Sequence, residues 1–141
     1  MSKIVDKAIN AIQNLALEIQ PVNIKAAPDY IPESAAVLPL AATHITGGTG
    51  SADDATQARL LLNINCDIHI QRDNIAFAYR QTNSIIPDFL QRLAGDPTLD
   101  GTVQTIIFPV TVTVSPADYN GIVTQMISFT IPIKFLEEPI T

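Results

Sequence analysis

Cys66, Asp67 and His69 could carry chemistry, and they lie within four residues of one another. Apolar and polar residues alternate around them, which predicts a β-strand whose neighbouring side chains point to opposite faces. Cys66 then falls on the apolar face and His69 on the polar one, so they cannot form the thiol–imidazole pair of a cysteine nucleophile. Asp67 and His69 share the polar face about 7 Å apart, but no third ligand follows at metal-binding spacing. We interpret Cys66 as a small buried side chain and the other two as hydrogen-bonded groups.

Other candidate groups lie in loops or beside them. The glycine-rich segment 46–57 lacks the Lys-Ser/Thr pair of a phosphate loop, and a strand rather than a helix follows it. Its Asp53 and Asp54 would be poorly positioned for acid–base catalysis on a flexible loop. Segment 96–100 has two aspartates and a proline but no glutamate to complete a calcium loop. His44 has no partner at ligand spacing. We therefore predict a protein that is not an enzyme and uses no metal or cofactor.

Composition limits the classes of protein that fit. A chain of 141 residues with 47% hydrophobic and 16% charged residues predicts one folded domain, 1–141. The net charge is −6 and no basic cluster occurs, which disfavours binding to nucleic-acid phosphates. The one cysteine excludes a disulfide framework. No signal sequence and no stretch of roughly 18–20 apolar residues is present, so we expect a reducing, cytosolic setting and no membrane partner.

Two amphipathic helices are expected from apolar residues that recur every three or four positions. The first covers residues 2–19, with Gln13 on its wet side. The second covers residues 74–94, with Asp73 as its N-cap and with Pro87 as a kink or break. Its core-facing stripe is predicted to be Ile75, Ala76, Tyr79, Ile85, Ile86, Phe89, Leu90 and Leu93.

Two pairs of strands complete the expected elements. Residues 35–42 and 58–71 predict one pair, joined by the flexible loop 46–57. Residues 102–135 predict a long terminal hairpin with its turn at 115–121. A strand of about 15 residues spans roughly 50 Å, more than the diameter of about 37 Å of a compact domain of this size. The hairpin must therefore bend or project, and a projecting uncharged hairpin needs a partner chain to cover it.

These elements predict an α+β fold of order α-β-β-α-β-β. The sheet is mainly antiparallel, both helices pack on one of its faces, and the chain ends in the long hairpin. Pro109 and Pro132 are the expected bends of that hairpin, because proline cannot donate to a sheet ladder. Asn120 belongs to its turn.

Four features of the sequence match a known family. They are the opening helix from Ile4 to Ile19, the connector Pro28-Asp29-Tyr30-Ile31-Pro32, the glycine loop before the alternating strand Leu60 to Ile70, and the turn Asp96-Pro97-Thr98-Leu99-Asp100-Gly101-Thr102-Val103 before the hairpin ending Phe129-Thr130-Ile131-Pro132-Ile133-Lys134-Phe135. In this order they resemble the tail terminator proteins of long-tailed bacteriophages, which are related in fold to the minor tail protein that caps the lambda-type tail tube.

The resemblance implies a structural virion protein that is assembled in the host cytoplasm and located in the tail or neck. It implies a homo-oligomeric, hexameric ring that caps the tail tube, stops its polymerisation and offers a docking surface to the head-side connector or stopper protein. DNA would pass through the lumen without specific binding, which suits an acidic protein. The candidates for interface or lumen are Asp53, Asp54, Pro109, Tyr119, Asn120 and Pro132.

Two other interpretations remain open at the level of the sequence. Another ring of the virion neck, a head-completion or stopper protein, would differ from a terminator in its partner. A cytosolic small-molecule-binding or enzymatic α+β domain would need a concave pocket with convergent titratable groups.

Overall fold

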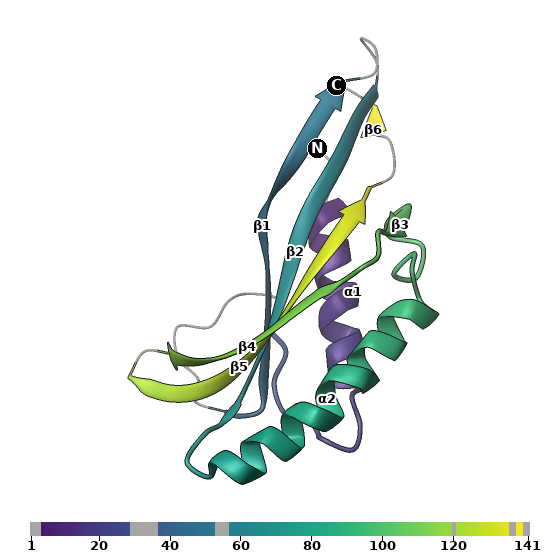
Figure 1. Ribbon diagram of the computed structural model, residues 1–141. Coiled ribbons are helices and arrows are strands. Elements are labelled where there is room, and N and C mark those ends of the chain that lie inside the picture. The colour runs from purple at the N-terminus through teal and green to yellow at the C-terminus, as the bar shows by residue number, and fades with distance from the viewer. Residues whose placement is uncertain (1–3, 29–36, 53–56, 120, 136–137, 140–141) are drawn as a thin grey trace.

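The computed structural model describes residues 4–28, 37–52, 57–119, 121–135 and 138–139. These residues form two helices and a six-stranded sheet (Figure 1). The coarse prediction of an α+β fold with a mainly antiparallel sheet is confirmed, and two short strands, β3 and β6, are added to the expected order. The elements are α1 (Ile4–Leu17), β1 (Leu40–Ala52), β2 (Gln57–Gln71), α2 (Ile75–Gly95), β3 (Thr105–Ile106), β4 (Thr111–Tyr119), β5 (Ile122–Lys134) and β6 (Glu138–Pro139).

The sheet places β5 between two long neighbours. Its strand order is β1-β2-β5-β3, with β4 also paired to β5 and β6 to β2. The named strands pair antiparallel throughout, and Ile127 of β5 lies opposite Ile68 on one side and Val114 on the other. The second strand of the terminal hairpin is therefore internal to the sheet, whereas β1, the β3–β4 side and the two-residue β6 form edges within the described residues.

Both helices pack on the same face of the sheet, because the alternate residues of β2 and β5 that face them are apolar. Phe129 of β5 stacks edge-to-face on Phe89 of α2, with the ring centroids 4.7 Å apart. Burial of these side chains is the main source of stability. The strand residues of this core include Ile64, Cys66, Ile68, Ile70, Ile127, Phe129, Ile131 and Ile133.

The helices correct two local predictions and exclude the predicted break at Pro87. Gln13 of α1 is buried, not solvated, because it reaches the connector and β1: its amide donates to the carbonyl oxygens of Pro28 (2.6 Å) and Ala41 (2.9 Å). The N-cap of α2 is Asn74, one residue after the predicted Asp73, and its side chain accepts from the Phe77 N–H at 3.0 Å. Pro87 lies inside α2 without dividing it.

The buried stripe of α2 also differs from the prediction. Ile75 and Tyr79 are 52% and 48% exposed, whereas Thr82 is buried. Thr82 can lie inside because the Gln125 amide of β5 donates to its hydroxyl oxygen at 2.5 Å, and the hydroxyl donates to the Ala78 carbonyl. The buried residues of α2 are Ala78, Thr82, Ile85, Phe89 and Leu93.

The first strand pair extends through the segment predicted to be a loop. β1 starts at Leu40, not at 35, and pairs with β2 as far as Ala52 opposite Ala58. Most of segment 46–57 is therefore strand, and Asp53 and Asp54 lie outside the described residues.

Two glycines make this extension possible. The register shifts between Ile45 and Gly47, where Gly47 and Gly48 have φ of +151° and +152°. A Cβ on Gly48 would lie 2.2 Å from the Leu61 carbonyl oxygen, so only glycine fits there. The part of this hairpin after the shift, residues 46–52 and 57–62, is called the β1–β2 arm below; it extends past the helices (Figure 1).

The terminal hairpin is shorter on its first side than predicted. Its first long strand, β4, covers Thr111–Tyr119 and includes most of the predicted turn. In segment 102–110, only the two residues of β3 are strand. Pro116 can occupy β4 because this strand is an edge. The turn is tightened by Gly121, whose φ is +89° and whose N–H donates to Asp118 Oδ1 at 2.7 Å.

Candidate functional site

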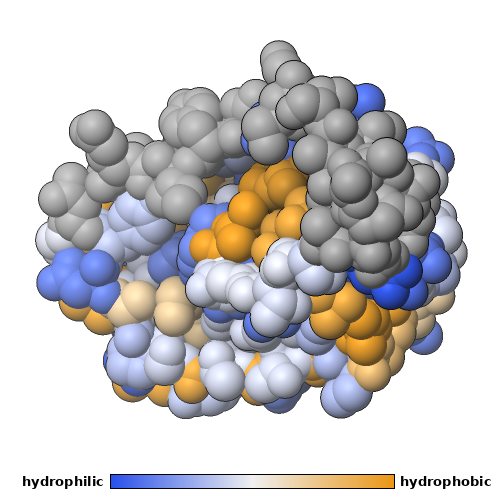
Figure 2. All heavy atoms as spheres, turned by 90° about the horizontal axis from the view of Figure 1, so that it is seen from above, coloured by the Kyte–Doolittle hydropathy of each residue, from blue (hydrophilic) through white to orange (hydrophobic). Residues whose placement is uncertain are grey.

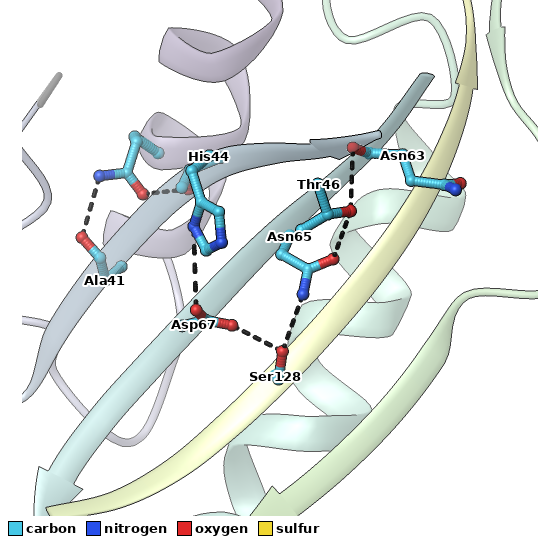
Figure 3. Close-up of polar contacts among 9 residues, drawn as sticks. Ala41, His44, Thr46, Asn63, Asn65, Asp67 and Ser128 are labelled. Carbon is cyan, nitrogen blue, oxygen red and sulfur yellow. Dashed lines mark hydrogen bonds and ion pairs between the residues drawn. The ribbon is translucent and has the colours of Figure 1, made fainter. Parts of the chain in front are cut away.

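A row of polar side chains crosses β1, β2 and β5 on the sheet face opposite the helices (Figure 3). Ser128 donates to Asp67 Oδ1 at 2.6 Å and accepts from the Asn65 amide at 3.3 Å. His44 Nδ1 lies 3.8 Å from Asp67 Oδ2, and the Thr46 hydroxyl is 3.5 Å from Asn65 Oδ1. The prediction that Asp67 belongs to a hydrogen-bonded polar face is confirmed.

Serine, histidine and aspartate meet in this row, but their order does not make a nucleophile. The carboxylate of Asp67 lies between Ser128 and His44, so the serine proton is held by the carboxylate and not by an imidazole. Activation of a serine needs a general base on its hydroxyl, with the acid behind that base. The row is therefore suited to fixing three strands relative to one another.

His69 forms a second polar contact on this face, beneath the end of the terminal hairpin. The imidazole is 4% exposed, its Nδ1 lies 2.8 Å from Thr124 Oγ1, and the Tyr119 ring packs edge-on at 4.8 Å. Burial lowers the pKa of His69, and the nearby charge of Asp67 opposes this only in part. Burial and then Asp67 raise the pKa of Tyr119. The end of the hairpin thus curls over the sheet, and the contact between two uncharged rings, His69 and Tyr119, holds it there.

Cys66 is fully buried on the helix side of β2, as the alternation predicts. Burial raises the pKa of its thiol to about 12, a contact with Thr43 opposes the rise, and Asp67 adds to it. A thiol with this pKa is not a nucleophile near neutral pH.

Two clefts lie near the helices, and their linings differ. A cleft of about 450 Å³ beside the start of α2 is lined largely by apolar residues, including Pro21, Pro39 and Phe77. Another of about 610 Å³ lies between α1 and the 96–102 turn, and its lining includes the titratable residues Lys7, Glu18, Asp96 and Asp100. His44, Cys66 and His69 line neither cleft. Within the described ranges, three or more His, Cys, Asp or Glu side chains nowhere gather in a way that could bind a metal.

The sheet edges are the most unusual surface of the molecule. In the described part of the chain, the outer side of β1 has one pairing, a bridge from Ala26 to Leu40 at its start. β1 contains no Asp, Glu, Lys or Arg in 13 residues, and the only charged residue of β4 is Asp118. Monomeric proteins usually protect exposed edges with charges, prolines or bulges. Among the residues that the structure describes, protection is limited to the Ala26 bridge and the register shift in β1 and to Pro116 and Asp118 near the end of β4.

Exposed apolar side chains lie next to both edges. Near the β1 edge, Ile45 and Leu61 are 42% and 41% exposed. At the other side, the β4–β5 end exposes Val114 (38%), Ile122 (41%) and Val123 (57%). Apolar atoms also reach the surface in the view from above (Figure 2). Uncharged edges flanked by apolar side chains are typical of surfaces that other chains cover.

The residues predicted as interface or lumen candidates do not converge. Tyr119 contacts His69, whereas Pro132 lies opposite Asn63 toward the other end of β5. Pro109 is exposed in the interruption between β3 and β4, and Asn120 lies outside the described residues. Of the candidates only Tyr119 lies in an edge strand, at the end of β4, and no residue of the β1 edge was among them. Their sequence signal is the absence of charge over residues 40–52, which acquires meaning only once that segment is known to be an edge.

No helix of the described chain is long and apolar enough to cross a membrane.

Comparison with protein-family models finds no match, and comparison with curated proteins finds none either. The geometry and charge of the chain are therefore the basis for inferring its function.

Proposed function

We propose that the protein is a structural virion subunit that forms a ring with further copies of itself and acts as a tail terminator of a long-tailed bacteriophage. The ring caps the tail tube, stops its polymerisation and offers its other surface to the head-side connector. The resemblance in element order supports this role. The observation that carries the proposal is a single sheet with two opposite, almost uncharged edges.

Two free edges on one sheet favour repeated association. When one edge of a copy meets the opposite edge of the next, the contact is heterologous, and such contacts close into a ring when the rotation between copies allows it. Strand addition supplies backbone hydrogen bonds without requiring particular side chains. A hexameric ring formed in this way needs no cofactor and no membrane partner.

The charge of the chain fits a conduit for DNA. With a net charge of −6 per copy, a ring presents a repulsive lumen through which a duplex slides without specific binding. Asp53 and Asp54 are the proposed lumen or docking residues. Replacing both with asparagine should alter DNA ejection or head–tail joining while the ring still forms; unchanged ejection and joining would exclude that placement.

The arrangement of polar groups favours a structural role over catalysis. The Ser128 hydroxyl is held by Asp67, the Cys66 thiol is buried, and His69 is capped by Tyr119. These three side chains are thus held inside the sheet or against it.

Electron microscopy of a phage whose gene for this chain is deleted tests the proposal. Overlong tails that are not joined to heads are expected, and a plasmid copy of the gene should restore normal length. Tails of normal length that remain separate from heads would instead assign the chain to a stopper or head-completion ring. Normal tails joined to heads would overturn any role in the neck.

A further inference from the structure

We propose that the β4 edge of one copy pairs with the β1 edge of the next copy, so that the sheets of successive copies join. This inference rests on the proposed function and names the surfaces through which the copies meet. It requires that β4 and β1 fit each other better than either fits a second copy of itself.

The two edges are comparable in extent. β4 is paired to β5 along all nine of its residues, and among the described residues no strand lies on the opposite side of Thr111–Asp118. On β1, Ala26 occupies only the start, where the Ala41 N–H donates to the Ala26 carbonyl oxygen at 2.9 Å. The remainder of β1, as far as Ala52, has no other strand on its outer side among the described residues. A nine-residue strand therefore fits along it.

The side chains of the two edges are complementary in size. Gly48 and Gly50 of β1 lie opposite Leu62 and Leu60 of β2, and the two leucine side chains lean over the glycines while staying partly exposed. β4 carries valines at 112 and 114, also two residues apart and also on the helix-facing side, opposite Phe129 and Ile127. In a continuous sheet, side chains on one face of adjacent strands pack together. The valines of β4 would thus pack across the glycines of β1 against the exposed parts of Leu60 and Leu62.

Pairing of like edges lacks this fit. Two β1 edges would bring glycine against glycine and leave Leu60 and Leu62 uncovered. Two β4 edges would bring valine rows together without covering either leucine. Electrostatics also favours these surfaces, because copies that each carry −6 repel one another except where charge is absent. The partner that fits the β4 edge is therefore the β1 edge of a second copy.

Edge-specific variants test the inference. One variant carries Thr111→Lys and Thr113→Lys on β4, and the other carries Thr49→Lys and Ser51→Lys on β1; all four positions are exposed. The control carries Asn10→Lys and Asn14→Lys on exposed positions of α1, which adds the same charge away from both edges. Circular dichroism and thermal unfolding verify the fold of each variant, and sedimentation velocity measures association of the full chain.

The wild type and the α1 control should associate as concentration rises, and each edge variant alone should lose at least tenfold in association constant. A mixture of the two edge variants should form dimers and nothing larger, because each variant retains one intact edge. A wild type that stays monomeric at the highest concentration reached would overturn the inference. So would an edge variant that alone associates like the wild type, or a mixture that stays monomeric.

The two proposals fail differently. A deletion phage with normal, joined tails would overturn the tail-terminator role, while the mixing experiment still reports on edge pairing. Overlong tails in the deletion, combined with a mixture that stays monomeric, would leave the role intact and overturn the edge pairing alone.

Discussion

The β1–β2 and β4–β5 hairpins belong to one sheet but are stabilised in opposite ways. The inner face of β5 is buried under the helices, with Ile127, Phe129 and Ile131 fully inaccessible. The β1–β2 arm instead extends past the helices (Figure 1), and three of its residues, Gly47, Gly48 and Gly50, have no side chain to pack. The more apolar hairpin is thus the more sheltered one, because β5 has strands on both sides and β1 has one.

This contrast shows that hydrophobicity and length alone do not decide which strands project. The sequence predicts that residues 102–135 bend or project. The structure has them curl over the open face, with Tyr119 against His69, and leaves the end of the hairpin exposed at Val123. The surface that needs a partner is therefore the pair of edges rather than the whole hairpin.

The largest effect is expected from Phe129→Ala in the buried half of β5. Removal of the ring leaves a cavity against Phe89 and should lower the free energy of unfolding by about 3–5 kcal/mol. Urea denaturation measures this change. Val123→Ala on the same strand is the control, and because Val123 is 57% exposed its effect should stay within about 0.5 kcal/mol. Similar losses for both variants would contradict the division of β5 into buried and exposed parts.

The next largest effect is expected from Gly48→Ala in the β1–β2 arm. The new Cβ meets the Leu61 carbonyl oxygen at 2.2 Å and the Leu62 Cα at 2.6 Å, and φ is unfavourable for alanine. Strain and overpacking should together cost about 3 kcal/mol. Urea denaturation gives the total loss, and amide hydrogen exchange shows whether it is confined to the arm.

Gly50→Ala is the matched control for Gly48→Ala. Its Cβ would approach only the Leu60 side chain, at 3.1 Å, which can adjust. We expect a clearly smaller loss than for Gly48→Ala. Equal losses would show that the close approach at Gly48 does not limit the arm.

The strands differ in how far the sequence predicts them. Residues 58–71 alternate strictly enough to predict β2 and the polar position of Asp67, because period-two patterning reflects a sheet with one covered face. The sequence does not predict that residues 46–52 belong to β1, because glycine carries no hydropathy pattern. This part of β1 is a strand only through its pairing with β2. Pro39 predicts that the strand at residues 35–42 lies at an edge or contains a bulge, and β1 is an edge strand with a register shift. The β4 edge is missed because its position depends on tertiary pairing, not on its own residues.

Buried polar residues are the second class that the sequence misplaces. Gln13 and Thr82 are polar by type, so a helical pattern assigns them to solvent. They are buried because Thr43 and Gln125, which are distant in sequence, provide hydrogen-bond partners. Such pairs become visible only when the strands are in place.

A smaller effect should come from Gln13→Ala at the base of the β1–β2 hairpin. The substitution removes the hydrogen bonds that join α1 to Ala41 and Thr43 of β1 and leaves the Thr43 hydroxyl without its acceptor. A loss of about 2 kcal/mol is expected in thermal or urea unfolding. Asn14→Ala, at the exposed neighbouring position, should change stability by less than about 0.5 kcal/mol. A loss no larger than that of Asn14→Ala would exclude Gln13 as the anchor of β1.

The smallest effect is a pH dependence at the curled end of the β4–β5 hairpin. Burial lowers the pKa of His69 below 6.5, so the unfolded chain takes up a proton before the folded one. Stability is therefore full above pH 6.5 and is lost as the pH falls from there through the folded pKa. Unfolding midpoints measured across this window should fall less in His69→Gln than in the wild type. Parallel curves would contradict the assignment, since His44 is present in both proteins.

Because Cys66 is buried, the rate at which a reagent labels its thiol measures how often the core opens. It is the sole cysteine and is fully enclosed between sheet and helices, with a pKa of about 12. A thiol reagent can reach it only in the moments when the helices separate from the strands. The labelling rate of the unmodified protein therefore counts core openings, and a ring that slows labelling would show how strongly assembly closes each subunit.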